Sequence, residues 1–540
     1  MKLRYQHANP FSGRESVLLR ISGVFEDQTI CILIDAGEGV NVDELLREDE
    51  YLTAICLTHA HYDHYRSLAE NLRHGASVYM TAETKELLSA VYDSVPPERG
   101  EKETVLSNTR IIDGWTSIVQ GVSIRALPAG HAPGASSLML AIDDGTTQRT
   151  VLATGDFTRR QAAGYPGFDP ELPVDVDVCL LSASANETFE EDLTGVIERS
   201  IERALDGSTV LVTASGQVGL QFGYLLGHTI DEQELTTTVT LAGESAKLAE
   251  RLDYSIPHCT TTAAFEPDQV LESGSITVAN PGTPAKNPAA GAGQLFEQIR
   301  DDPGATLIQV PTDGPPVDGA GCTIHTERVQ NHPTPETIDA VVRSLEPIHL
   351  VVLHETGPNA DRYKDRYHSY VWVTADRLEH TLLEDGVWTP PGWVSEHTEE
   401  MVHTWRITGR DAHRTVTDPE LDFPTIERQK SPDLSAEGLT LGAFDVRPER
   451  SELEGGKYPL APASSTEQSQ TEPNQPDAIE SLTERIERLE NTIQNTILES
   501  NRQTGRVLDV TDGVTIVRVD GTFPEITAGD HVAVSNPDEL

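Results

Sequence analysis

The sequence predicts an α/β protein made of several layered domains, and three observations lead to this expectation. Short apolar strands alternate with turns and helical stretches from the start to about residue 181. A second run of strands and helices continues to about residue 355, and the pattern weakens after about residue 395. At 540 residues the chain is too long for one hydrophobic core, so two to four domains are expected.

The first region reads as a layered α/β domain, because apolar strands are followed by helical stretches such as 41–47 and 82–91. Its predicted strands are 16–22, 29–37, 54–61, 122–128 and 150–156. The second region continues the alternation of helix and strand, and a helix at 335–345 followed by a strand at 349–355 closes it. Its predicted segments before that pair are 192–205, 208–215, 219–226, 241–252, 275–281 and 305–311.

The C-terminal sequence predicts a tether to the same chain or to a complex rather than a further catalytic domain. Residues 461–477 are polar and contain proline, which is typical of a disordered linker. A heptad seam follows and predicts a short coiled coil, although an amphipathic helix packed on its own chain is the alternative. The residues of the seam are Ile479, Leu482, Ile486, Leu489 and Ile493. Residues 506–521 and 530–535 then indicate a small β-unit with an Asp-Gly turn.

The composition is strongly acidic, with a net charge of −47 and only eight lysines among 40 basic residues. Acid-rich, lysine-poor surfaces stay hydrated in molar salt, so a haloarchaeal source is the favoured interpretation and an ordinary acidic protein the alternative. The Debye length in molar salt is only about 3 Å, so this acidity does not exclude a nucleic-acid substrate. The acidity does exclude a broad basic surface as the feature that indicates nucleic-acid binding.

Neither a membrane-spanning segment nor a disulfide framework is expected. No stretch approaches the roughly 18 apolar residues of a membrane span, and the first residues lack the apolar segment of a secretory signal. The five cysteines are scattered without CxxC spacing, which argues against disulfides and a thiolate zinc site. We therefore expect a cytoplasmic protein.

The strongest motif is THAHYDH at 58–64, directly after an apolar strand. It places His59, His61, Asp63 and His64 on one tight loop, and imidazole and carboxylate groups at this density suit zinc or a related divalent ion. A chance solvated cluster is the alternative. Without a cation, four such groups on one turn would repel one another or remain without partners.

Four further residues stand at the ends of other predicted strands. Asp35 ends the strand of ILIDAG, and His131 lies in the glycine-flanked loop PAGHAPGAS. Asp156 and His354 each follow an apolar strand, in ATGDF and VVLHE. A lone histidine or aspartate after a strand is more often structural, but the order of these residues after the THAHYDH loop favours one shared metal site.

At this point the chain resembles the metallo-β-lactamase superfamily, whose dinuclear members combine an HxHxDH loop with a later His, Asp and His. The resemblance implies an αββα sandwich with two divalent ions, zinc or manganese. It implies that one ion is held by His59, His61 and His131, the other by Asp63, His64 and His354, with Asp156 bridging. Asp35 matches the acidic residue that supports the metal loop. Such a pair of ions provides a nucleophilic hydroxide at neutral pH and stabilises displacement at phosphorus.

Asp156 and His354 are 198 positions apart, which leaves room for an inserted domain, and this arrangement is similar to that of the β-CASP group of RNA nucleases. Residues 332–355 resemble the family stretch that runs from a catalytic histidine through a helix to the last ligand. The resemblance therefore assigns His332 to phosphate contact or proton donation near the leaving oxygen; a purely structural place at the helix start is the alternative.

The resemblance also has departures. Ser182 stands where the family places an acid, so it is a candidate for substrate binding that can hydrogen-bond but supplies no negative charge to raise the pKa of His332. Glu187, nearby in the sequence, is the alternative source of that charge. Leu220 replaces an arginine expected to bind phosphate, and Glu355 follows His354 directly. The predicted domains are a first metallo-β-lactamase part at 1–190, an inserted β-CASP-like α/β domain at 191–328, the return at 329–400, an extension and linker at 401–477, the coiled coil at 478–503 and the β-unit at 504–540.

The sequence leaves several functions open. The first expectation is a metal-dependent ribonuclease in RNA processing or decay that acts on single-stranded RNA. The alternatives are hydrolysis of another phosphodiester, such as DNA or a cyclic nucleotide, hydrolysis of a small ester or thioester, and a non-catalytic scaffold subunit of a processing complex. A homo-oligomer or a larger complex, held by the coiled coil, is the expected assembly.

Overall fold

The computed structural model describes residues 1–25, 28–94, 101–263, 270–284, 290–311, 314–364, 366–408, 415–442, 505–511 and 514–519. The chain divides into two compact units, Met1–Pro448 and Glu449–Leu540. The predicted linker at 461–477 and the predicted coiled coil at 478–503 lie outside the described residues. In the second unit, β22 (Gly505–Thr511) and β23 (Val514–Val519) pair as an antiparallel hairpin, within the range expected for the small β-unit.

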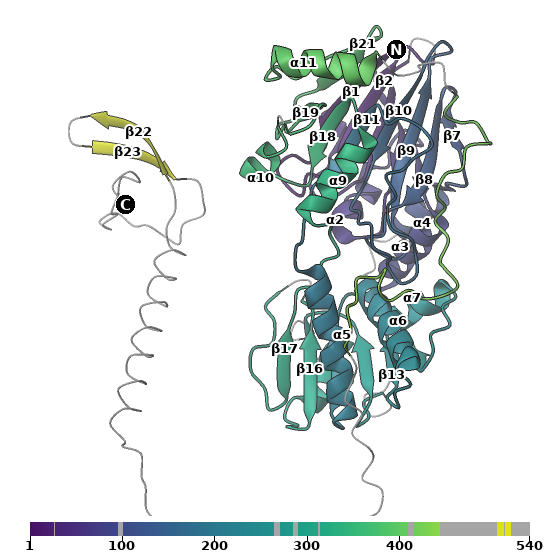
Figure 1. Ribbon diagram of the computed structural model, residues 1–540, viewed down its shortest axis with the longest axis vertical. Coiled ribbons are helices and arrows are strands. Elements are labelled where there is room, and N and C mark those ends of the chain that lie inside the picture. The colour runs from purple at the N-terminus through teal and green to yellow at the C-terminus, as the bar shows by residue number, and fades with distance from the viewer. Residues whose placement is uncertain are drawn as a thin grey trace, which may run out of the picture. The chain divides into compact units, whose positions relative to one another are not determined.

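Two mixed sheets form the upper body of the first unit in Figure 1. The strand order of the first sheet is β21 (Val387–Trp388), β20 (His380–Glu384), β1 (Lys2–His7), β2 (Val17–Ser22), β3 (Ile30–Ile34), β4 (Tyr51–Cys56), β5 (Ser77–Met80) and β6 (Thr109–Ile111). The order of the second sheet is β19 (Tyr370–Trp372), β18 (His349–Leu353), β11 (Val178–Ser182), β10 (Gln148–Ala153), β9 (Ser136–Asp143), β8 (Val122–Pro128) and β7 (Thr116–Val119).

Alternation of apolar side chains along the strands produces the layers. Leu19 and Ile32 of the first sheet belong to one buried cluster with Leu140 and Val351 of the second, so the sheets pack face to face. The opposite faces are covered by helices. The helices of this body are α1 (Val42–Leu45), α2 (Tyr62–Tyr65), α3 (Ala82–Ser94), α4 (Glu101–Ser107), α9 (Pro335–Leu345), α10 (Gly357–Asp361) and α11 (Glu396–Val402).

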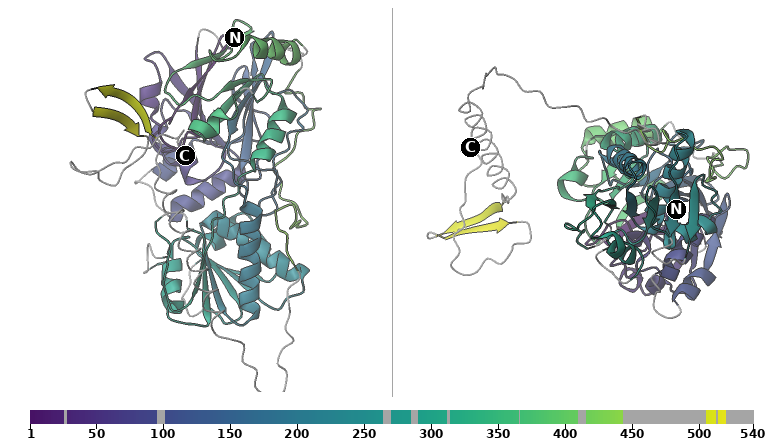
Figure 2. Two further views of the ribbon diagram at one scale, coloured as in Figure 1. Left: turned by 60° about the vertical axis from the view of Figure 1, so that its left-hand side comes forward. Right: turned by 90° about the horizontal axis from the view of Figure 1, so that it is seen from below.

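A second α/β body is inserted between β11 and β18, and it forms the lower part of Figure 1 and of the left view in Figure 2. Its six strands are all parallel, which requires crossover connections, here made largely by helices. Their order is β14 (Cys259–Thr262), β13 (Val239–Ala242), β15 (Ile276–Ala279), β12 (Thr209–Thr213), β16 (Ala305–Gln309) and β17 (Thr323–Thr326). The helices of this body are α5 (Phe189–Leu205), α6 (Gly216–Glu232), α7 (Glu244–Arg251) and α8 (Ala292–Ile299).

Residues 415–442 run over both bodies, and we call this segment the strap. The amide of Gln161 in the first body donates to the carbonyl of Ala436. The guanidinium of Arg428 donates to the carbonyls of Leu252 and Asp253 in the inserted body, at 2.9 and 2.7 Å. The strap therefore fastens the inserted body to the first body. None of the helices in the described ranges is long and apolar enough to cross a membrane.

Glu437 is the fully buried centre of the strap. Its carboxylate accepts hydrogen bonds from the amides of Ala163, at 2.9 Å, and Gly164, at 2.6 Å. The amide of Gln221 on α6 lies 3.5 Å from it. Burial raises the pKa of Glu437 to about 7, against the opposing effect of these hydrogen bonds.

Glu437→Gln is expected to remove part of the pH dependence of stability. Because the pKa of Glu437 is raised on folding from 4.5 to about 7, its contribution is complete below about pH 4.5 and is lost as the pH rises through 7. The free energy of unfolding of the wild type, relative to the variant, should fall by about 3 kcal/mol between pH 4 and pH 8. Urea unfolding in molar KCl measures it, with exposed Glu427→Gln as control. Equal pH profiles of wild type and Glu437→Gln would contradict the prediction.

Candidate metal centre

The THAHYDH loop leaves the end of β4 and turns directly into α2, so its polar side chains emerge at one point. His61 is the N-cap of α2, and the amide of His64 donates to the carbonyl of His61 at 3.0 Å. His59 and His61 of this loop meet His131, which lies in the loop after β8. One ring nitrogen from each of these three histidines lies within 4.8 Å of the others.

A second group forms around Asp156, which follows β10. Its carboxylate lies 3.5 Å from Nε2 of His64 and 3.7 Å from Nε2 of His131. The same carboxylate lies 3.0 Å from Nδ1 of His354, which follows β18. Asp63 lies 3.9 Å from His64 and 3.7 Å from Nε2 of His354. All seven side chains that the sequence singled out are thus within reach of one centre, at the carboxyl ends of their strands.

The ring nitrogens of the cluster show that a divalent ion fits. His59 and His64 each use Nδ1 within the protein, toward Thr58 Oγ1 at 3.0 Å and Asp35 Oδ2 at 2.8 Å. Their Nε2 atoms are buried and have no hydrogen-bond partner in the described structure. His131 Nε2 and His61 Nδ1 face each other at 3.0 Å. Nitrogens arranged in this way present their lone pairs to a cation, and neutral imidazoles with carboxylates are the ligands that zinc and manganese share.

Asp35 orients the loop and does not reach the centre. Its carboxylate accepts from the amide of Thr58 at 2.8 Å, from the Thr58 hydroxyl, and from Nδ1 of His64. It is buried and has a left-handed backbone, with φ of 55°. This hydrogen bond fixes the His64 tautomer, so that Nε2 is left for a cation.

The protonation of the histidines divides the cluster into two parts. Burial and the neighbouring histidines lower the pKa of His59, and they lower the pKa of His61 to about 3. Burial also acts on His64 and His354, but nearby carboxylates, chiefly Asp35 and Asp156 respectively, outweigh it and raise their pKa. A proton on these two rings competes with a cation, so acid should weaken metal binding.

His332 lies beside the cluster. Its ring centroid is 4.9 Å from that of His131, and its ligand atom groups with those of His131 and Asp156. Its Nδ1 is buried without a hydrogen-bond partner in the described structure. Burial lowers the pKa of His332 to about 4, while Asp156 opposes this effect. The free ring is therefore neutral near pH 7.

Ser182, at the end of β11, points at the cluster. Its hydroxyl donates to Asp156 at 2.6 Å and lies 3.4 Å from Nδ1 of His354. The side chain is buried. The hydroxyl of Ser182 therefore orients the carboxylate of Asp156, and a contact of Ser182 with the substrate stays a prediction. Leu220 is buried within α6, so this position offers nothing to a phosphate.

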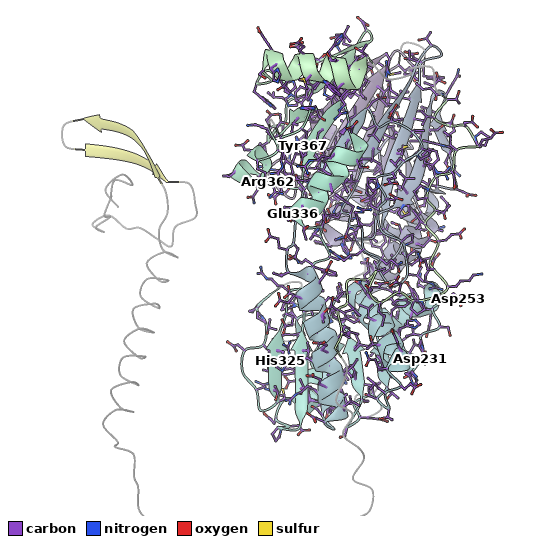
Figure 3. The ribbon with its side chains drawn as sticks, viewed as in Figure 1. Asp231, Asp253, His325, Glu336, Arg362 and Tyr367 are labelled. Atoms are coloured by element: carbon purple, nitrogen blue, oxygen red, sulfur yellow. The ribbon has the colours of Figure 1, made fainter. Side chains whose placement is uncertain are left out.

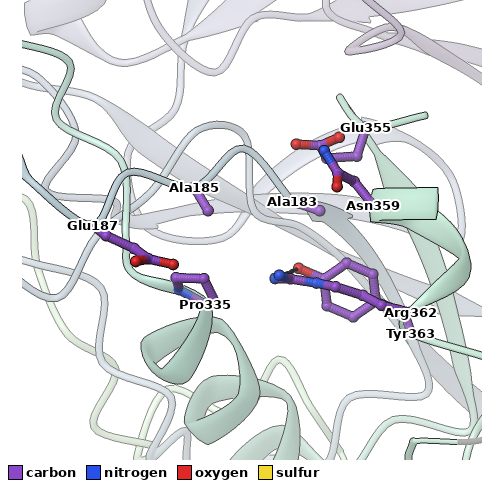
Figure 4. A pocket seen from close by; sticks show the side chains of 8 residues that line it. All are labelled: Ala183, Ala185, Glu187, Pro335, Glu355, Asn359, Arg362 and Tyr363. Atoms are coloured by element: carbon purple, nitrogen blue, oxygen red, sulfur yellow. Dashed lines mark hydrogen bonds between the residues drawn. The ribbon is translucent and has the colours of Figure 1, made fainter. Parts of the chain in front are cut away.

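A pocket of about 170 Å³ begins where the loops after β11 and β18 leave the cluster (Figure 4). Ala183 and Glu355, which line it, directly follow Ser182 and His354. The guanidinium of Arg362 points into the pocket and donates to the hydroxyl of Tyr363 at 2.7 Å. Arg362 directly follows α10, on the face shown in Figure 3. The other residues of the lining are Ala185, Glu187, Pro335 and Asn359.

Two residues near the cluster were given no role from the sequence, although Arg160 ends the TGDFTRR run that resembles the family's stretch after Asp156. Asn331 contacts His131 through both its carbonyl and its side chain, and Arg160 contacts Asn331 in turn. Neither belongs to a ligand motif, and about 200 residues separate His131 from Asn331. Only the folded chain brings them together.

Comparisons with known proteins agree with this geometry. Residues 20–194 match the family model of the metallo-beta-lactamase superfamily, and no curated protein matches the chain. Among solved structures, the chain is similar to a protein of unknown function from Enterococcus faecalis V583, with 16% identity and a TM-score of 0.50. That similarity covers 71% of this chain and 100% of the other, and at this identity it concerns the fold alone. Residues 20–194 therefore form a metallo-beta-lactamase superfamily domain, and members of this superfamily are metal-dependent hydrolases.

Proposed function

We propose that the protein is a dinuclear hydrolase that cleaves phosphodiester bonds in nucleic acid, with single-stranded RNA as its first substrate, in RNA processing or decay. The observation that carries this proposal is the position of His332. A segment that returns from the inserted body brings this imidazole to His131 and Asp156, at the edge of the metal cluster. Hydrolysis of a small ester would not require this second body.

The ligands divide into two sets in this proposal. His59, His61 and His131 would hold one ion, and Asp63, His64 and His354 would hold the other. Asp156, which lies at similar distances from His64 and His131, would be shared by the two sets. Zinc or manganese at such a pair of sites lowers the pKa of water and neutralises charge on a phosphoryl oxygen.

The protein side chains have separate tasks around the scissile phosphate. Asp35 and Ser182 orient His64 and Asp156, as their hydrogen bonds indicate. His332 contacts the phosphate or the leaving oxygen. Arg362, in the adjoining pocket, provides a guanidinium for the continuing strand, although Glu187 and Glu355 in the same lining limit the charge available there.

The inserted parallel α/β body, placed between β11 and β18, supports assignment to the β-CASP type of nuclease. The strongly acidic composition is compatible with this substrate if the protein works in molar salt, as expected for a haloarchaeal source, because short-range contacts then dominate over net charge. Buried Leu220 and the serine at 182 favour the alternative of a non-catalytic subunit, since two groups of the nuclease pattern are absent.

The decisive experiment is a cleavage assay on RNA and DNA single strands labelled at either end. It uses the full chain in molar KCl with zinc or manganese, and His61→Ala/His64→Ala as the control. Cleavage of RNA by the wild type alone is expected, and the product ladder separates internal from terminal cleavage. Cleavage of DNA or a cyclic nucleotide instead would favour the other phosphodiesterase. Two bound ions without cleavage of any strand would overturn the nuclease proposal and favour a scaffold.

A further inference from the structure

Asn331 joins a residue of the metal cluster to the segment that carries His332. Nδ1–H of His131 donates to the backbone carbonyl of Asn331 at 2.7 Å. A carbonyl can only accept, so this bond places the proton on Nδ1 and leaves Nε2 for a cation. The orientation of His131 thus depends on a residue that follows the inserted body in the sequence.

The side chain of Asn331 strengthens the same connection. Its Nδ2 donates to the carbonyls of Gly130 and His131, at 3.0 and 2.9 Å, which fixes the loop after β8. Its Oδ1 accepts from the guanidinium of Arg160, at 3.1 Å to Nη2. A flipped amide would face a donor with a donor and two carbonyls with an oxygen, so these partners determine its orientation.

Arg160 connects this junction to both bodies. It follows β10 and lies four residues after Asp156, and its Nη2 also donates to the carbonyl of His332 at 2.6 Å. Its guanidinium packs on the ring of Phe189 at the start of α5, 4.5 Å from the centroid, and donates to Glu190 at 3.1 Å. Arg160 therefore holds the 331–332 segment against the first helix of the inserted body.

We infer that Asn331 and Arg160 are positioning residues that couple metal binding at His131 to the docking of the 331–332 segment between the two bodies. The inference rests on the proposed metal centre. Docking of the segment orients His131 for a cation, and a cation bound to His131 stabilises the docked segment. This coupling is reciprocal, because any ligand that binds the docked state more tightly must favour that state. His332 then reaches the cluster chiefly when His131 is oriented to bind the cation.

The expected effect is a loss of metal affinity without loss of a ligand. Asn331→Ala removes both side-chain donors to the loop, and Arg160→Lys keeps the positive charge but loses the planar fork that reaches Asn331 and His332. Removal of groups that orient a metal-ligating histidine typically lowers metal affinity by about 10- to 100-fold. Arg159→Ala is the matched control, because Arg159 is the exposed neighbour of Arg160.

The test titrates zinc into the metal-free full chain in molar KCl, in competition with a chromophoric chelator. Hydrogen exchange of the peptide that spans 329–334 is measured with and without zinc. We expect Asn331→Ala and Arg160→Lys to bind zinc about 10- to 100-fold more weakly than Arg159→Ala and the wild type. Zinc should protect 329–334 in the wild type and less in the two variants.

Other outcomes would overturn either the coupling or the proposed metal centre. Wild-type zinc affinity in both variants, or exchange of 329–334 that zinc leaves unchanged, would overturn the coupling. A wild type that binds no zinc or manganese would instead overturn the proposed metal centre. Exchange in β9 and β10 reports whether each variant is folded. If Asn331→Ala is unfolded, Asn331→Asp of nearly equal size takes its place, since a carboxylate cannot donate to the loop carbonyls.

Discussion

Asp156→Ala is expected to abolish hydrolysis, with a loss of at least about a thousandfold, or about 4 kcal/mol of transition-state stabilisation. The carboxylate of Asp156 lies between His64, His131 and His354, at 3.5, 3.7 and 3.0 Å. Its removal takes away the negative charge that would offset a second cation, and the imidazoles that remain supply no such charge. The variant should therefore bind fewer metal ions per chain as well as lose activity.

Metal content by elemental analysis and the rate of strand cleavage test this prediction together. Asp156→Asn, which keeps the size of the side chain, should behave like Asp156→Ala, because the charge is the property that is needed. Asp175→Ala is the matched control, since Asp175 is exposed in the segment before β11. Two ions per chain with wild-type cleavage in Asp156→Ala would contradict the assignment of Asp156 as the bridge.

Much of the candidate site could be predicted because its signals are local. His59, His61, Asp63 and His64 lie within six residues, so their proximity follows from the loop itself. His131 and Asp156 follow β8 and β10, which run in the same direction in one sheet, so their side chains emerge at the same edge. The helix predicted at 335–345 matches α9 because Thr334 caps it, Pro335 starts it and Glu346 ends it in a left-handed conformation.

Other features could not be predicted, for physical reasons. Only Val42–Leu45 is helical of the helix expected at 41–47, because Leu46 leaves the helix in an extended conformation. The helix expected from residue 219 begins at Gly216, where the Ser215 hydroxyl caps it. The strap has no periodic pattern, since it is held by hydrogen bonds that Arg428 donates to backbone carbonyls and that Glu437 accepts from backbone amides of other segments. Asn331 acts through contacts 200 residues apart, which no spacing rule reaches.

His332→Ala is expected to lower kcat by about 100- to 10,000-fold while leaving metal content unchanged. His332 stands beside His131 and Asp156 but lies on the separate segment that returns from the inserted body. Burial lowers its pKa to about 4 in the free protein, so the free ring carries no charge at pH 7. A phosphodiester brought next to the ring favours the imidazolium and raises this pKa, which makes proton donation to the leaving oxygen feasible in the complex.

The pH dependence and the metal content distinguish the roles open to His332. If it donates a proton, the alkaline limb of the kcat profile should disappear in His332→Ala, and substrates with a better leaving group should recover much of the lost rate. If it only contacts phosphate, KM should rise and the pH profile should stay. Loss of an ion would make His332 a metal ligand instead, which its grouping with His131 and Asp156 permits geometrically. His325→Ala, on β17 of the inserted body, is the matched control, and unchanged kcat and KM in His332→Ala would remove this residue from the reaction.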